Sequence, residues 1–250
     1  MTYTEKYFSH IHSLLDTLFE TQKDSIRALA EKCFETSQNG GKLFFFGCSH
    51  AGILAQEAFY RTGGLVTANP ILPKGLTLET VPVTDTTVLE RKEEYAHEIL
   101  DNTDIKAGDL LVVHSVSGRN GVPVEMAIEA KKRGIFVACI TNITTSSASS
   151  SRHSSGKRLY EVSDIVLDNC GCIGDAAIEI EGFKGKTAAT STITGAAIIN
   201  SLCAEIVGLY VENGLEPPVF MSANVDGGDE YNDKMFEKYK NAITYMGSAE

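Results

Sequence analysis

Basic residues are scarce in this sequence, which has 22 Lys and Arg against 33 Asp and Glu and a formal net charge of −11. Proteins that bind nucleic acid neutralise phosphates with clusters of Lys and Arg. An anionic membrane surface attracts the same residues. The composition therefore argues against nucleic acid and against a membrane as partners. It leaves room for a small anionic ligand, which needs only local amides and one or two cations.

Long apolar runs are also missing, because no segment has about 18 consecutive apolar residues as a membrane-spanning helix requires. The first residues, MTYTEKYFSHIHS, lack the apolar centre of a signal peptide. The pair Cys170 and Cys172 has no second cysteine pair of the kind that structural zinc sites use. We therefore expect a cytoplasmic protein with reduced thiols, and we expect neither a metal nor a cofactor.

Nucleotide-binding signatures are absent as well. The sequence contains no G-x-x-x-x-G-K-[ST], and the turn GCSHAG at residues 47–52 is not G-x-G-x-x-G. A nucleotide therefore fits poorly, and a phosphate on a smaller molecule fits better.

The sequence does contain apolar runs that alternate with helical patterns. Buried strands are predicted at residues 42–46, 65–68, 110–114, 135–141 and 164–168. Helices are predicted at residues 4–36, 51–61, 90–100, 122–133, 190–213 and 231–246, with a long connection at 69–88. Apolar strands that alternate with helices indicate an α/β fold, a doubly wound parallel five-stranded sheet with helices on both faces. We expect one domain over 1–250, with an N-terminal helix (1–41), a core (42–213) and a C-terminal loop and helix (214–250).

Three turns combine small residues, hydroxyl groups and a helix start, at residues 47–52, 115–121 and 188–195. Helix starts expose free amides and the positive end of the helix dipole, so they suit anions. Ser and Thr at such positions can equally be ordinary helix caps. Because ligands of doubly wound sheets bind outside the carboxyl ends of the strands, three such turns at one edge favour a phosphate site.

The stretch DLLVVHSVSGRNGVPVEMAIEAKKRGIFVACIT resembles the core of the sugar isomerase (SIS) domain family, with the signature S-x-S-G-x-[ST] after a strand. Ser115, Ser117 and Gly118 match this signature, while Asn120 stands where the family usually has Thr or Ser. The long N-terminal helix makes the chain most similar to the phosphoheptose isomerase-like branch. It also resembles uncharacterised bacterial SIS-domain proteins that share SRHSSGKRLYE and SANVDGGDEYN.

This resemblance implies a flavodoxin-like fold, a sugar-phosphate ligand and a homodimer or homotetramer. It also implies a set of residues for the phosphate and the sugar hydroxyls: Ser49, Ser115, Ser117, Gly118, Asn120, Ser191 and Thr192. Glu57 stands where phosphoheptose isomerase has a metal-binding His, and Arg61 stands where it has a catalytic Glu. This departure places the metal and the chemistry of that enzyme in doubt for this chain.

Aldose–ketose isomerisation requires a base that moves a proton between adjacent carbons. Glu57 is a candidate because apolar residues surround it, although a helical Glu is often simply solvated. His50 in the first turn can titrate near neutral pH, or it can be structural. His153 and Lys157 lie in a Ser-rich segment that is either a flexible loop or a substrate contact. Asp175 lies in a turn that is either solvated or functional.

The sequence thus predicts a phosphosugar isomerase that works through an enediol. Two alternatives stay open. One is a lyase that acts on a sugar-phosphate ether, since it also begins by removing a proton. The other is a sugar-phosphate sensor without catalysis, although no DNA-binding domain is expected before the first strand.

Overall fold

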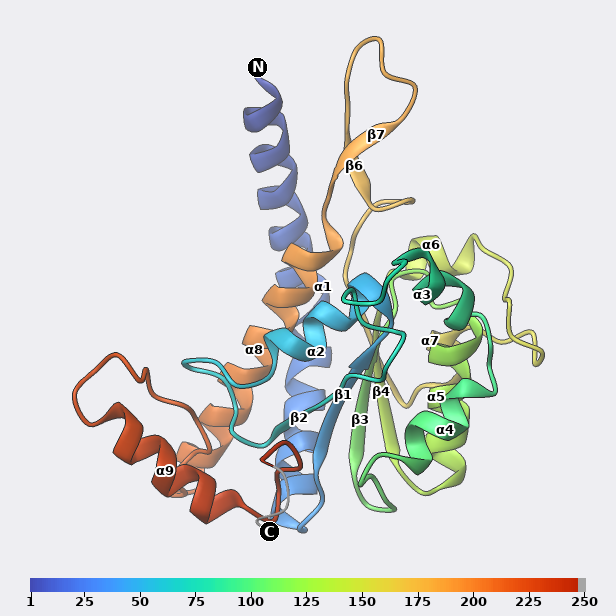
Figure 1. Ribbon diagram of the computed structural model, residues 1–250. Coiled ribbons are helices and arrows are strands. Elements are labelled where there is room, and N and C mark those ends of the chain that lie inside the picture. Colours follow the sequence, from blue (N-terminus) through green and yellow to red (C-terminus); the bar gives the residue numbers. More distant parts are fainter. Residues whose placement is uncertain (247–250) are drawn as a thin grey trace.

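The computed structural model describes residues 1–246, which form a five-stranded sheet in the order β2-β1-β3-β4-β5 with every strand pair parallel (Figure 1). The strands are β1 (Leu43–Gly47), β2 (Ala68–Ile71), β3 (Leu110–His114), β4 (Phe136–Thr141) and β5 (Ile165–Asp168). The predicted α/β fold with a flavodoxin-like sheet is confirmed. In this order β2 is added on one side of β1, and β3, β4 and β5 follow on the other side, so the topological switch point lies between β1 and β3.

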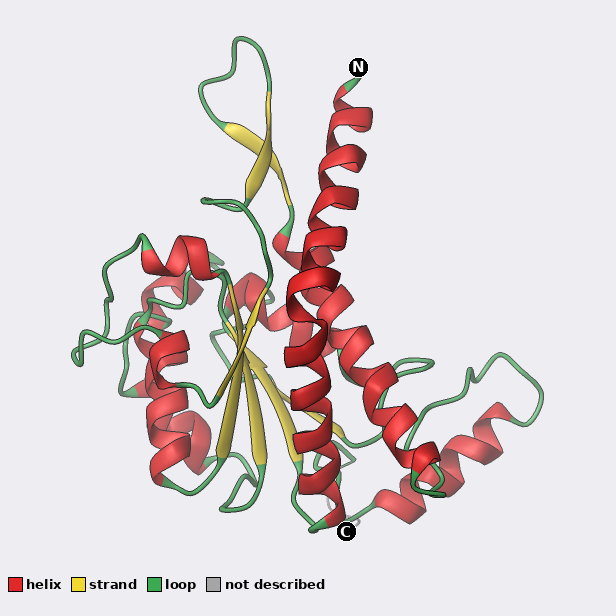
Figure 2. Cartoon of the chain, turned by 180° about the vertical axis from the view of Figure 1, so that it is seen from behind, coloured by secondary structure: helices red, strands yellow, loops and turns green. Residues whose placement is uncertain are grey.

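Alternate residues of each central strand face two different layers of helices. Leu110 and Val112 pack with α1 (Tyr3–Gln38) and α8 (Ser191–Glu212), whereas Leu111 and Val113 pack with α4 (Tyr95–Asp101), α5 (Gly121–Lys132) and α7 (Leu159–Val162). Figure 2 shows α1 and α8 crossing on one side of the sheet. Both faces are therefore covered, which explains why the strands carry no polar alternation.

The helix α8 is long and apolar enough to cross a membrane by length and composition alone. In the structure it packs along α1, and its side chains Ile198, Leu202 and Ile206 are buried in the core. Its apolar composition is accounted for by this position between α1, α2 (Ile53–Glu57) and the sheet.

Several predicted boundaries differ from the structure. The second strand occupies Ala68–Ile71 instead of 65–68, and the helix expected at 51–61 is a 3-10 turn (Ser49–Gly52) followed by the short α2. The long connection at 69–88 contains α3 (Thr84–Leu89). The Ser-rich segment contains the short helix α6 (Ile143–Ser147) and the start of α7. These elements are only four to six residues long, too short for a periodic pattern to reveal them.

Two parts of the chain project beyond the edge at which the strands end. One is the first half of α1, and the other is a hairpin of β6 (Ala176–Glu179) and β7 (Lys186–Ala189) that the sequence did not predict (Figure 1). The Tyr7 hydroxyl donates to the carbonyl of Ala189 at 2.7 Å, which joins the two at their base.

The C-terminal segment packs on the side of β2. Its helix α9 (Gly228–Tyr239) begins and ends earlier than predicted, and Phe220, Met235 and Ile243 form a small core with Val66. The predicted segment 214–250 ends with four residues, 247–250, that lie outside the described part of the chain.

Candidate functional site

The first turn follows β1 at the switch point. Ser49 has a left-handed backbone (φ 53°), and its amide donates to the carbonyl of Leu76 at 2.7 Å. Its hydroxyl oxygen is buried and has no hydrogen-bond partner within residues 1–246. His50, the next residue, is exposed. The structure therefore places both predicted residues at the carboxyl edge of the sheet, where the Ser49 hydroxyl has no partner among the described residues.

The second turn, residues 115–121, joins β3 to α5 at the same edge. The Gly118 amide donates to the hydroxyl oxygen of Ser115 at 3.3 Å, and the Thr141 hydroxyl donates to the Ser115 carbonyl at 2.7 Å. Gly118 has φ 56°, and a Cβ there would lie 2.9 Å from the hydroxyl oxygen of Ser146. These contacts hold the turn rigidly and leave the half-buried Ser117 at its apex.

The third turn is occupied by a carboxylate of the chain itself. Asp175 Oδ1 accepts from the amides of Thr190 and Ser191 at 3.0 and 2.8 Å, and Oδ2 accepts from the Ser191 hydroxyl at 2.6 Å. Burial raises the pKa of Asp175, but these hydrogen bonds outweigh it and leave the pKa lowered. The structure corrects the expectation for Ser191, because an anion already fills the start of α8. Among the described residues, no polar contact of the half-buried Thr192 supports a role in ligand binding.

Replacement of Asp175 by Ala is expected to lower the free energy of unfolding by about 1–2 kcal/mol, the usual cost of losing a helix cap. Because the pKa of Asp175 is lowered, this difference should be present at neutral pH and disappear as the pH falls below the ordinary carboxyl range. Urea unfolding at pH 7 and pH 3 measures it. Glu181→Ala, which removes an exposed carboxylate at the hairpin, serves as the control. An equal loss in both variants would contradict the capping role.

His114 is a polar residue of this edge that sequence reasoning treated only as the last residue of a strand. Its side chain lies on the α8 side of the sheet, since it alternates with Val112, and the residue is 4% exposed. Its Nδ1 lies 2.9 Å from the carbonyl oxygen of Ala51. Burial lowers the pKa of His114 to about 4, so the ring is neutral at pH 7. A histidine at the end of a fully apolar strand was the only signal in the sequence.

Glu90 is a second residue that the sequence did not single out. It caps α3 beside the second turn, where its carbonyl accepts from the Val122 amide at 2.9 Å. Burial raises the pKa of Glu90, although Asn120 and the cations Arg152 and Arg91 partly offset this. A partly buried carboxyl group with a raised pKa at a ligand edge is a candidate acid or base.

Arginine side chains gather next to Glu90. Arg152 donates to Asn120 Oδ1 at 2.9 Å, and Arg119 donates to the Ser150 hydroxyl at 3.1 Å. Burial, Arg119 and Arg91 together lower the pKa of Arg152. The predicted ligand-binding Asn120 therefore contacts a cationic group in an otherwise acidic chain.

Glu57 lies on the α8 side of α2. Its carboxylate forms an ion pair with Arg61 and accepts from Asn200 Nδ2 at 2.8 Å. Among the described residues these polar partners come from the bend after α2 and from the middle of α8. The two turns contribute none of them. The structure thus does not bring Glu57 together with Ser115 and Ser117.

His153 differs most from its predicted role. It is buried, and both ring nitrogens are engaged. The Ser155 amide donates to Nδ1 at 3.1 Å, so Nε2 carries the proton and donates to Glu125 Oε2 at 2.8 Å. This corrects the expectation of a catalytic His153, because a base needs a free nitrogen. Lys157 is exposed, and its assignment to the substrate stays a prediction.

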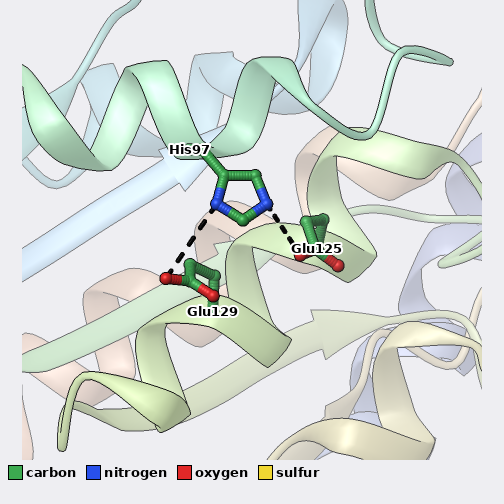
Figure 3. A group of neighbouring side chains, drawn as sticks. All are labelled: His97, Glu125 and Glu129. Carbon is green, nitrogen blue, oxygen red and sulfur yellow. Dashed lines mark ion pairs between the residues drawn. The ribbon is translucent and has the colours of Figure 1, made fainter.

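A histidine–carboxylate group formed by His97, Glu125 and Glu129 lies between α4 and α5 (Figure 3). The potential ligand atoms are within 4.8 Å of one another, so these residues could reach a metal ion. However, His97 Nε2 faces Glu125 at 3.0 Å, Nδ1 faces Glu129 at 3.9 Å, and Lys132 lies 3.3 Å from Glu129. The two ring nitrogens of His97 therefore face two different carboxylates. This arrangement favours an ion-pair network that anchors His153 over a metal site.

A cavity of about 880 Å³ opens beside the first turn. Its wall is formed by the end of α2 with Phe59 and Tyr60, and by the connection 72–81 with Lys74. Since the Ser49 amide binds Leu76 in this connection, the cavity adjoins the switch point. It offers space for a ligand that extends from the edge of the sheet.

Comparison with known proteins finds relatives over nearly the whole chain and solved structures with the same fold. A UPF0309 protein of Oceanobacillus iheyensis is 46% identical over 246 residues, which cover 98% of this chain and 100% of that protein. A phosphoheptose isomerase of Neisseria gonorrhoeae has the same fold, with a TM-score of 0.55 and 15% identity over 82% of this chain and 97% of that chain.

A second solved structure shares the fold, the Vibrio vulnificus NanR protein complexed with ManNAc-6P. Its TM-score is 0.51 at 17% identity, over 95% of this chain and 70% of that chain. The sequence model of the SIS domain matches residues 6–142, which include β1, β3 and the first two turns. With this match over more than half of its length, the chain belongs to the SIS domain family.

Proposed function

We propose that this protein binds a sugar phosphate at the carboxyl edge of its sheet and isomerises it between aldose and ketose forms. The observation that carries the proposal is the rigid turn at residues 115–121, which lies beside the switch point and carries the family signature. Solved structures with this fold include phosphoheptose isomerases. A ManNAc-6P complex of NanR supports a sugar phosphate as the class of ligand.

The phosphate is assigned to the second turn. Ser117 offers its hydroxyl at the apex, and Gly118 lets a ligand approach the backbone because it has no side chain. Asn120 and Arg152 supply donors on the flank. The start of α8 is left out of this assignment, because Asp175 already binds there.

A carboxylate is assigned as the base that moves the proton through the enediol. Glu90 fits this role better than Glu57. Glu90 lies beside the second turn and has a raised pKa, whereas the Glu57 carboxylate is paired with Arg61. His50, which is exposed in the first turn, is assigned the exchange of a proton with the sugar's ring oxygen. General bases of this kind contribute about 10²–10⁴ to the rate.

The test begins with thermal melts in the presence of C5–C7 sugar phosphates, the free sugars and inorganic phosphate, each with and without chelator. A ligand at about 100 times its Kd adds about 2.7 kcal/mol. The best ligand is then incubated in D2O, and exchange of its C2 proton is followed by NMR. We expect exchange in the wild type, a loss of about 10²–10⁴ with retained binding in Glu90→Gln, and weaker binding by about tenfold in Ser117→Ala.

Other results would redirect the proposal. Binding without proton exchange indicates a sugar-phosphate sensor, and exchange accompanied by release of an ether substituent indicates a lyase. A loss of exchange in Glu57→Gln but not in Glu90→Gln restores the assignment made from the sequence. If no sugar phosphate shifts the melt, the protein shares only the fold of the isomerases.

Assembly into a homodimer or homotetramer stays a prediction. Exposed aromatic residues on the projecting parts support it, namely Tyr3, Phe8 and Phe19 on α1 and Phe183 on the hairpin. Apolar surface of this kind commonly marks contacts between subunits.

A further inference from the structure

The ring of His114 is fixed in one tautomer by its surroundings. Its Nδ1 lies 2.9 Å from the carbonyl oxygen of Ala51, and a carbonyl can only accept a hydrogen bond. Nδ1 therefore carries the proton. In the neutral ring the other nitrogen, Nε2, is then an acceptor with a free lone pair.

This acceptor is buried and has no hydrogen-bond partner in the part of the chain that the structure describes. Buried polar atoms of native proteins almost always have one. His114 is 4% exposed, so bulk water does not solvate the ring freely. An acceptor that is maintained in this position favours a donor that comes from outside residues 1–246.

The location of His114 connects this acceptor to the ligand edge. His114 is the last residue of β3 and lies opposite Gly47, the last residue of β1, so it borders the switch point. Two residues beyond Gly47, the Ser49 hydroxyl is also buried and without a partner among residues 1–246. Two such atoms flank the place where ligands of doubly wound sheets bind.

We propose that His114 is a specificity-determining residue that accepts, through Nε2, a hydrogen bond from a hydroxyl group of the sugar. This inference rests on the proposed function and extends it. A fully ionised phosphate has acceptors only, so it cannot satisfy Nε2. The switch point therefore holds the polyol part of the ligand, with Ser49 beside it, and the phosphate points toward the turn at residues 115–121.

The experiment compares the wild type with His114→Asn and His114→Gln. Asn keeps an N–H near the Ala51 carbonyl but has no atom at the Nε2 position, whereas Gln can extend an amide oxygen toward it. Isothermal titration measures the affinity for the best sugar phosphate of the melt screen and for analogues that each lack one hydroxyl. Inorganic phosphate is titrated into every variant to show that each one is folded and retains its anion site.

In the wild type we expect one deoxy analogue to bind at least tenfold more weakly than its parent. The affinity of His114→Asn for the parent sugar phosphate should fall by about the same factor. Its affinity for that deoxy analogue should fall no further. His114→Gln should recover part of the difference. If removal of the hydroxyl from the ligand weakens binding by the same factor in the wild type and in both variants, the role of His114 is overturned and the proposed function is left intact. A wild type that binds no sugar phosphate would overturn both.

Discussion

Between pH 7 and pH 4 the wild type is expected to lose about 3 kcal/mol of stability that the His114→Asn variant does not lose. The folded state holds His114 with a pKa of about 4 because the ring is buried, against 6.5 for an exposed histidine. As the pH falls through 6.5, His114 takes up a proton in the unfolded chain, whereas its buried ring stays neutral in the folded chain. Stability is therefore lost progressively down to about pH 4, where the folded ring is protonated too.

Urea unfolding at several pH values between 4 and 8 measures this effect as the difference between the two proteins. Other groups titrate in this range, but they do so in both proteins and cancel. His12→Asn removes an exposed histidine and serves as the matched control, which should follow the wild type. A difference that stays constant with pH would show that burial does not lower the pKa of His114 in the folded state.

Replacement of Glu125 by Ala is expected to lower the free energy of unfolding by about 3 kcal/mol. Glu125 is a buried carboxylate that accepts from His153 at 2.8 Å and lies 3.0 Å from His97. Breaking one side of a buried polar network costs about 3–5 kcal/mol. The lower end applies here, because Glu93 lies 3.2 Å from His153 Nε2 and can take over part of the contact.

Glu129→Ala is the matched control for this prediction, since Glu129 lies one turn further along α5 and makes more exposed ion pairs. It should cost less than about 1 kcal/mol. Hydrogen exchange adds a local measurement. Because His153 anchors the segment 148–158, Glu125→Ala should lose protection there, and Glu129→Ala should not. Equal protection in both variants would show that the segment is held by other contacts.

The strands at the centre of the sheet were predicted closely. The strand at 110–114 has the predicted bounds. The strand at 42–46 is shifted by one residue from β1, and the strand at 135–141 begins one residue before β4. Such strands are buried on both faces, so all residues before the last one are apolar and the run is visible in the sequence. The hairpin of β6 and β7 was missed because it is short and mostly exposed, and neither strand has an apolar pattern.

The candidate site was predicted only in part. The two turns after β1 and β3 lie at one edge, as their positions after adjacent parallel strands implied. The free helix start expected at Ser191 is filled by Asp175, and the base expected at His153 is a buried partner of Glu125. These contacts join residues that are 16 and 28 positions apart in the chain, and no local pattern encodes them.

The sequence by itself determined the class of fold, the edge of the sheet to which the ligand is assigned and the family signature in the second turn. Each depends on local order, since apolar runs make strands, glycines permit turns and helix starts expose amides. Only the tertiary structure decided which polar groups remain free. His114, Ser49 and Glu90 acquired their burial and their partners, or their lack of partners, from elements distant in the chain. Desolvation is a property of the packed molecule, so the chemistry of the site follows from packing.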